Sequence, residues 1–165
     1  MNGEISSIEF WIAAAFIPVL IATGMSDLRQ MRIPNRLSWT GLAIFVLCFP
    51  LLGPEEWAFR SLAGLSALMV CFGLFAAGWL GGGDAKIFPV TILFIPLGHL
   101  AIYMFAFSAA MIVGMVGIWI ARQFFSRPDS VWVSMQPGKA FPMGISIAMS
   151  LPFFLVAQHV LMQSL

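Results

Sequence analysis

The sequence contains few charged residues for its length. Asp, Glu, Lys and Arg make up 9% of its 165 residues, whereas hydrophobic side chains account for 61% and the mean hydropathy is +0.97. An ordinary soluble domain carries about 25% charged residues, so this composition excludes one. The net charge is +1, and without a basic excess there is no reason to expect nucleic acid as a partner. We therefore expect an integral membrane protein.

Cysteine is also scarce. The two cysteines, Cys48 and Cys71, both lie inside apolar runs, far apart from one another and outside any CxxC pair. This spacing argues against a zinc site and against a disulfide framework. We expect two buried, chemically inert thiols and no metal site.

Charged residues divide the chain into uncharged runs whose lengths suit membrane helices, which need about 20 residues to cross a bilayer. One run, 87–121, is about 35 residues long and exceeds a single crossing, but a turn signal at 96–99 splits it in two. The sequence thus predicts an all-α, polytopic protein of about six transmembrane helices with a short fourth helix, in a single domain over residues 1–165. The other four runs are 10–26, 37–54, 61–83 and 140–165.

Positively charged residues concentrate in three of the predicted loops, whereas the opposite loops are mainly acidic. Because Lys and Arg favour the cytoplasmic side of a membrane, we expect the basic loops in the cytoplasm and both termini outside. The N-terminal stretch MNGEISSIEF is acidic, so the first apolar run is expected to be a retained span and not a cleaved signal. The basic residues are Arg29, Arg32, Arg36, Lys86, Arg122, Arg127 and Lys139.

Two aspartates, Asp27 and Asp84, lie where predicted spans one and three reach the cytoplasmic face. The topology places them at one depth, so they can meet in space. Two carboxyls that share one proton can activate water and protonate a scissile carbonyl, and ionisable groups at membrane depth are functional candidates. Three glycines, 81–83, precede Asp84, and they would allow a peptide backbone to approach and would permit non-helical dihedrals. This pattern favours an intramembrane aspartic protease.

Other interpretations of these residues stay open. Asp84 could cap the short helix after a glycine turn, while Asp27 pairs loosely with Arg29 or Arg32. The chain could also be a small ion channel or transporter whose path is lined by Asp27, Asp84 and Lys86, or an assembly subunit of a secretion system. The charges cluster at one face and do not reach towards the midplane, which favours the protease over a transporter.

Three motifs, in this order, resemble those of the type IV prepilin peptidases. SDLRQMRIPNRLSW (residues 26–39) is similar to their first active-site motif, and GGGDAK (81–86) is similar to their GxGD motif, which presenilin-type proteases share. KAFPMGISIA (139–148) resembles their late K-x-x-P-x-G-x-x-I element. The resemblance covers nearly the whole chain.

This resemblance implies a membrane aspartic endopeptidase of the bacterial inner membrane, a hydrolase that acts at the cytoplasmic face. Its partners would be membrane lipid and a prepilin substrate, which has a basic leader followed by an apolar helix, and no metal or organic cofactor is implied. Asp27 and Asp84 would be the catalytic pair. The resemblance assigns supporting roles to Gly81, Gly83, Lys86, Pro34, Asn35, Lys139, Pro142 and Gly144.

More specific expectations follow for the supporting residues. Pro34 and Asn35 are expected to turn the chain and cap the second helix. Lys86 is expected to anchor the membrane interface and not to contact substrate. Pro142 suits the first turn of the last helix, and Gly144 suits close helix packing.

One departure from the larger family members bears on substrate type. Those members carry an extra cytoplasmic segment with paired CxxC motifs and also N-methylate the new pilin terminus, and this chain has no CxxC motif. It resembles the small form associated with Flp-type, tight-adherence pili, so proteolysis without methyl transfer is expected. The sequence leaves the cognate pilin and the oligomeric state open.

Overall fold

The structure, a computed structural model, describes residues 6–163, which form helices joined by turns and contain no strand. The fold class predicted from the sequence is thereby confirmed. The helices are α1 (Ser7–Gln30), α2 (Asn35–Leu47), α3 (Phe49–Leu52), α4 (Pro54–Ala76), α5 (Asp84–Ile92), the 3₁₀ turn η1 (Leu97–His99), α6 (Leu100–Phe125), the 3₁₀ turn η2 (Val133–Met135) and α7 (Met143–Gln163).

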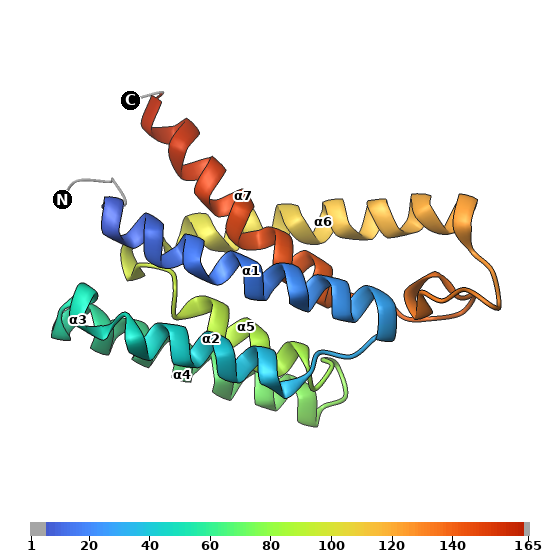
Figure 1. Cartoon of the computed structure of the whole chain (residues 1–165), viewed down its shortest axis with the longest axis horizontal. Helices are drawn as coiled ribbons and strands as arrows, with labels where there is room; N and C mark the ends of the chain where they lie inside the picture. Colours follow the sequence, from blue (N-terminus) through green and yellow to red (C-terminus); the bar gives the residue numbers. More distant parts are fainter. Residues whose placement is uncertain (1–5, 164–165) are drawn as a thin grey trace.

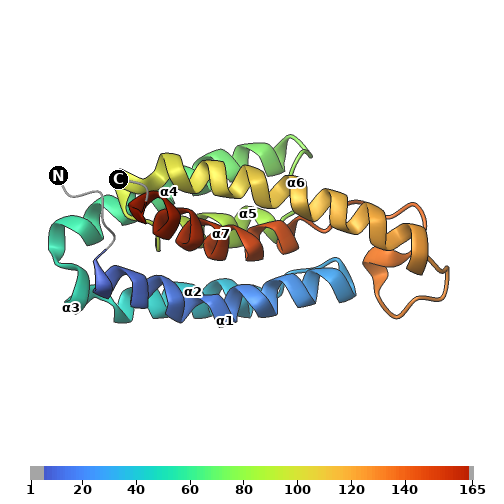
Figure 2. The same cartoon turned by 90° about the horizontal axis from the view of Figure 1, so that it is seen from above.

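The helices form two groups, in which α7 runs obliquely to α6 (Figures 1 and 2). Helix α7 packs against both α1 and α6, while α5 packs against both α4 and α2. Contacts of α1 with α2 and of α5 with α7 join the groups. The short helix α5 therefore lies inside the bundle, in contact with neighbours on several sides.

Within the described residues, four helical segments are long and apolar enough to cross a membrane: Ser7–Gln30, Pro54–Ala76, Leu97–Phe125 and Met143–Leu161. Of the other predicted spans, α2 has 13 residues, or about 20 Å of helix, and α5 has nine. Both fall short of a hydrocarbon core of about 30 Å. Each predicted run thus overlaps a helix, but the count of six spans is not confirmed.

The predicted third span, 61–83, is shifted along the chain relative to α4. Helix α4 begins at Pro54, which suits a first helical position, and two glutamates in its first turn stabilise its N-terminus. It ends at Ala76, and Gly78 follows with a left-handed φ of 76°. Arg60 therefore lies inside the helix, fully buried, and pairs with Glu9 and Glu56.

The core forms where α1, α5, α6 and α7 meet. Phe16 and Phe94 are fully buried, and their rings stack with centroids 4.2 Å apart. The Tyr103 and Phe154 rings, also buried, meet edge to face at 5.9 Å. Tyr103 satisfies its hydroxyl through a 3.0 Å hydrogen bond with Ser150. The Phe16–Phe94 contact joins the two helix groups, and the Tyr103 contacts fix α6 to α7 within one group.

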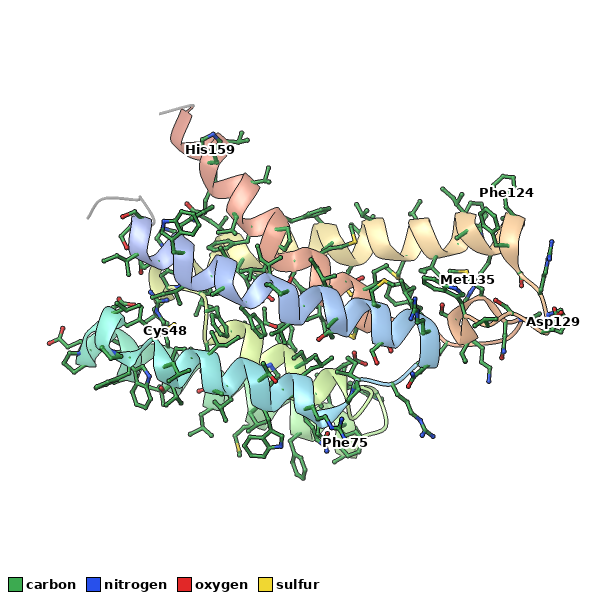
Figure 3. All side chains as sticks on the ribbon, viewed as in Figure 1. Cys48, Phe75, Phe124, Asp129, Met135 and His159 are labelled. Atoms are coloured by element: carbon green, nitrogen blue, oxygen red, sulfur yellow. The ribbon has the colours of Figure 1, made fainter. Side chains whose placement is uncertain are left out.

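The two ends of the bundle differ in the segments that they carry. Both ends of the described chain lie at one end of the bundle, and the turns after α1, α4 and α6 lie at the other (Figure 1). Asp129 marks the loop after α6, at the end remote from His159 (Figure 3). All three predicted basic loops therefore share one end of the bundle. The prediction that both termini lie outside concerns residues 1–5 and 164–165, which are not among the described residues.

Candidate active site

The last turn of α1 positions Asp27. The helix ends because Met31 adopts a left-handed φ of 53°, with its N–H donating to the Asp27 carbonyl at 2.8 Å. Ile33 then precedes Pro34, which disfavours further helix. The hydroxyl of Ser26 fixes the turn by donating to the Arg32 carbonyl at 2.8 Å. The Asp27 side chain is buried, with a residue exposure of 6%.

Asp27 is held by the start of α7. Its Oδ2 accepts a hydrogen bond of 2.7 Å from the backbone N–H of Gly144, the second residue of that helix. The first N–H groups of a helix have no partner within it and carry partial positive charge, so they suit a carboxylate. A methyl carbon on Gly144 would lie 2.9 Å from Oδ2 of Asp27. The expected close packing at Gly144 is thus a close approach to a carboxyl group.

The suggested pairing of Asp27 with an arginine of its own loop is wrong. Within residues 6–163 the ion pairs found are those of Arg60 with Glu9 and with Glu56. The Arg29 guanidinium instead lies 5.5 Å from the ring centre of Trp132, in the loop before α7. Asp27 is therefore a buried carboxyl whose hydrogen bond comes from the backbone.

The glycine turn before Asp84 is closely packed. A methyl carbon on Gly81 would lie 2.6 Å from Oδ2 of Asp84, and one on Gly83 would lie 2.9 Å from Cβ of Ile33. These glycines therefore let the Asp84 carboxyl and the turn after α1 approach the backbone. Gly83 itself has helical dihedrals, φ −71° and ψ −47°, so the expectation of a non-helical backbone is wrong for this residue. The left-handed glycine of the turn is Gly78.

Asp84 is the first residue of α5 and does not cap the helix. Gly83 occupies the N-cap position, and no side-chain capping hydrogen bond is present. The Oδ1 atom of Asp84 is buried and finds no hydrogen-bond partner among the described residues. Burial, with a further contribution from the negative charge of Asp27, raises the pKa of Asp84 to about 7. The two carboxyls are therefore close enough to influence each other's ionisation.

Lys86 connects the first two motifs. Its Nζ donates to Oδ1 of Asn35 at 3.1 Å. Asn35 is the first residue of α2 and gives no side-chain cap, while Pro34 occupies the N-cap position, so the capping prediction is wrong for Asn35. Lys86 is exposed and lines a groove of about 600 Å³ between α2, α4 and α5. Lys86 comes two positions after Asp84 in α5, which corresponds to a rotation of about 200° around the helix axis. Its side chain therefore faces away from the Asp84 carboxyl.

The third motif, residues 139–148, contributes a backbone N–H group to the candidate site. Pro142 is buried directly before α7, and Gly144 supplies the amide that binds Asp27. Lys139 is exposed, and no hydrogen bond or ion pair of its side chain is found within the described part of the chain. The structure thus brings together Asp27, Asp84 and Gly144 and leaves Lys139 at the surface.

Sequence reasoning missed Arg122, which was counted only as a topology-setting cation. Its guanidinium binds the carbonyls of Ser134 and Ala140 in the loop before α7. No spacing in the sequence indicates this role, because the partners are main-chain oxygens. Within residues 6–163 no group of three or more His, Cys, Asp or Glu side chains is placed to hold a metal ion.

Apolar helices of membrane-spanning length are typical of a multi-pass membrane protein, and the carboxyls of Asp27 and Asp84 lie near one another at one end of the bundle. Residues 14–119 match the type IV leader peptidase family, and the chain belongs to this family. The matched range includes Asp27 and Asp84 and ends before Gly144.

One curated relative is the prepilin leader peptidase/N-methyltransferase of Bacillus subtilis (strain 168), which is 34% identical over 87 residues. The aligned region is 51% of this chain and 35% of the relative, so the chain covers about a third of the relative's length. No solved structure matches the chain.

Proposed function

We propose that this chain is a prepilin peptidase that removes the leader peptide from a type IV prepilin of the Flp-like kind, with Asp27 and Asp84 as its catalytic pair. Family membership and the named function of the relative support the reaction class. The observation that carries the residue assignment is that buried Asp27 and Asp84, whose Oδ1 atom is buried, come from two separate motifs and lie close enough for the charge of Asp27 to raise the pKa of Asp84.

The geometry supports different roles for the two aspartates. Oδ2 of Asp27 is occupied by the Gly144 amide, which leaves Oδ1 to take a proton from the attacking water. Asp84 retains its proton up to a pH of about 7 and can donate it to the scissile carbonyl oxygen. The tetrahedral intermediate then collapses: the C–N bond breaks and the leaving amine takes the proton from Asp27. Asp84 recovers its proton from the intermediate as the new carboxyl group forms.

The location follows from the distribution of charge. The basic turns lie at the same end of the bundle as the two aspartates, and Lys and Arg favour the cytoplasmic side. We place this end at the cytoplasmic face of a bacterial inner membrane, where the substrate's basic leader would meet the site and its apolar helix would enter the lipid. The Flp-like assignment rests on the resemblance to the small form of the family, for which proteolysis without methyl transfer is expected.

A co-expression experiment tests the proposal. The chain is expressed with a Flp-type prepilin, and leader removal is scored as a mobility shift on a gel, with the product terminus read by mass spectrometry. We expect cleavage by the parent and none by Asp27→Asn or Asp84→Asn at matched membrane levels. Asp129→Asn is the matched control, since Asp129 lies in the exposed loop after α6 (Figure 3). Absence of cleavage by the parent across a panel of type IV prepilins would favour the channel or assembly interpretation.

A further inference from the structure

The loop before α7 is attached to both neighbouring helices. Arg122, in the last turn of α6, donates from Nε and Nη2 to the Ser134 carbonyl at 3.0 and 2.8 Å. The same Nη2 donates to the Ala140 carbonyl at 2.8 Å. On the other side, Arg29 of α1 lies over the ring of Trp132. One guanidinium thus joins two points of the loop that are six residues apart.

The Ala140 carbonyl lies close to the active site along the chain. Gly144, whose N–H binds Asp27 at 2.7 Å, lies four positions after Ala140. Phe141 lies beside α6, since a methyl carbon on Gly114 would be 3.3 Å from its ring, and Pro142 is buried. The segment from Ala140 to Gly144 is therefore held against α6 at its start and against α1 at its end.

We propose that Arg122 is a positioning residue for the active site, one that fixes the entry into α7 so that the Gly144 amide points at the carboxylate of Asp27. The catalytic importance of this contact rests on the proposed function. Arg122 suits the task because its planar guanidinium can serve two carbonyls at once, whereas a lysine ammonium lacks that fixed geometry. Within residues 6–163 its hydrogen bonds go to main-chain oxygens and it forms no ion pair with a carboxylate.

A simple alternative is that Arg122 only stabilises the C-terminus of α6 by its charge, as a basic residue in the last turn of any helix does. In that case, removing the Arg122 guanidinium would leave the position of the Gly144 amide unchanged. The two readings therefore differ in what happens at Gly144, 22 residues further along the chain.

The Gly144 amide can be observed by itself. Met143–Gly144 is the sole Met-Gly step in the sequence. Protein in nanodiscs that is labelled with carbonyl-¹³C methionine and ¹⁵N glycine therefore gives one carbonyl-selected amide signal, from Gly144. Asp27→Asn provides the reference for the shift of this signal when the carboxylate is lost.

We expect Arg122→Gln to move the Gly144 amide proton signal in the same direction as Asp27→Asn does, and Arg122→Lys to move it part of the way. The same variants should lower kcat for leader removal on the order of tenfold for Arg122→Gln and less for Arg122→Lys, with KM within about threefold of the parent. Arg127→Gln, the same charge change at an exposed residue of the same loop, should alter neither.

A Gly144 signal at the parent position in folded Arg122→Gln would overturn the proposal, whether or not that variant cleaves. Thermal melting in nanodiscs identifies a variant that fails to fold, in which case Arg122→Lys carries the test by the same criterion. The signal is recorded without substrate, so its outcome is independent of whether the chain cleaves prepilins.

Discussion

Gly144→Ala is expected to separate Asp27 from the amide that binds it. The added Cβ would lie 2.9 Å from both Cβ and Oδ2 of Asp27 and 3.1 Å from Cγ. Because non-bonded carbons settle at about 3.5–4.0 Å, the groups must move apart by roughly 0.5–1 Å. The present N–H···O distance of 2.7 Å would then grow to about 3.2–3.7 Å, at or beyond the limit of a useful hydrogen bond.

The cost of this separation can be converted to a rate. A hydrogen bond to a charged group contributes about 1.5–3 kcal/mol, and about 1.4 kcal/mol corresponds to a factor of ten in rate. If the reaction depends on the placement of the Asp27 carboxyl, kcat for leader removal should fall about 10- to 150-fold. The assay is the initial rate of cleavage of a purified prepilin by the reconstituted protein.

The matched control for this substitution is Gly117→Ala in α6. Among residues 6–163, and apart from the neighbouring backbone of α6 itself, no atom lies within 4 Å of a Cβ built on Gly117, so alanine fits there, and alanine is the better helix former. We expect parental cleavage from this variant. A folded Gly144→Ala protein with the parental kcat would refute the reasoning, since the Asp27–Gly144 contact would then have no role in the reaction.

Four further predictions follow from the structure. Asp84, with its pKa raised to about 7, is protonated below that pH and ionised above it, so cleavage should decline as pH rises through about 7; a rate unchanged up to pH 9 would contradict this. Gly83→Val should abolish cleavage, because its Cβ would lie 2.9 Å from Cβ of Ile33. A fully active variant would show that the turn before α5 can move to accommodate the larger side chain. Lys86→Met removes only a 3.1 Å hydrogen bond at the surface and should reduce cleavage less than tenfold, whereas complete loss of cleavage would require a direct role in the reaction. Glu9→Gln should destabilise the fold by about 1–3 kcal/mol, because fully buried Arg60 keeps its charge but loses its ion pair with Glu9. An unchanged melting temperature would show that Glu56 alone is enough to compensate the charge of Arg60.

Much of the fold could be predicted from the sequence, because the lengths of the apolar runs and the positions of the charged residues largely determine where the helices lie. The positions of the uncharged runs correspond to the helices, and the basic loops share one end of the bundle. Helix ends were less predictable. Arg60 was expected to end a run, yet it lies inside α4 because Glu9 and Glu56 compensate its charge. An ion pair between residues 51 positions apart leaves no local pattern in the sequence.

The candidate site was predictable to the extent that it depends on side chains within motifs. Asp27 and Asp84 were identified from their positions at the ends of apolar runs and from the motifs around them. The contacts that hold them were not predictable, because the Gly144 amide and the carbonyls bound by Arg122 belong to the backbone. Every residue carries such groups, so only the fold determines which of them meet.

The most direct test of the central claim is the initial rate of leader removal by purified protein in lipid vesicles, measured for Asp27→Asn, Asp84→Asn and the control Asp129→Asn. Each variant is first shown to be folded by its melting profile. The proposal predicts no detectable product from either of the first two variants and a parental rate from the third. Cleavage at the parental rate by Asp27→Asn or by Asp84→Asn would contradict a catalytic pair formed by these two residues.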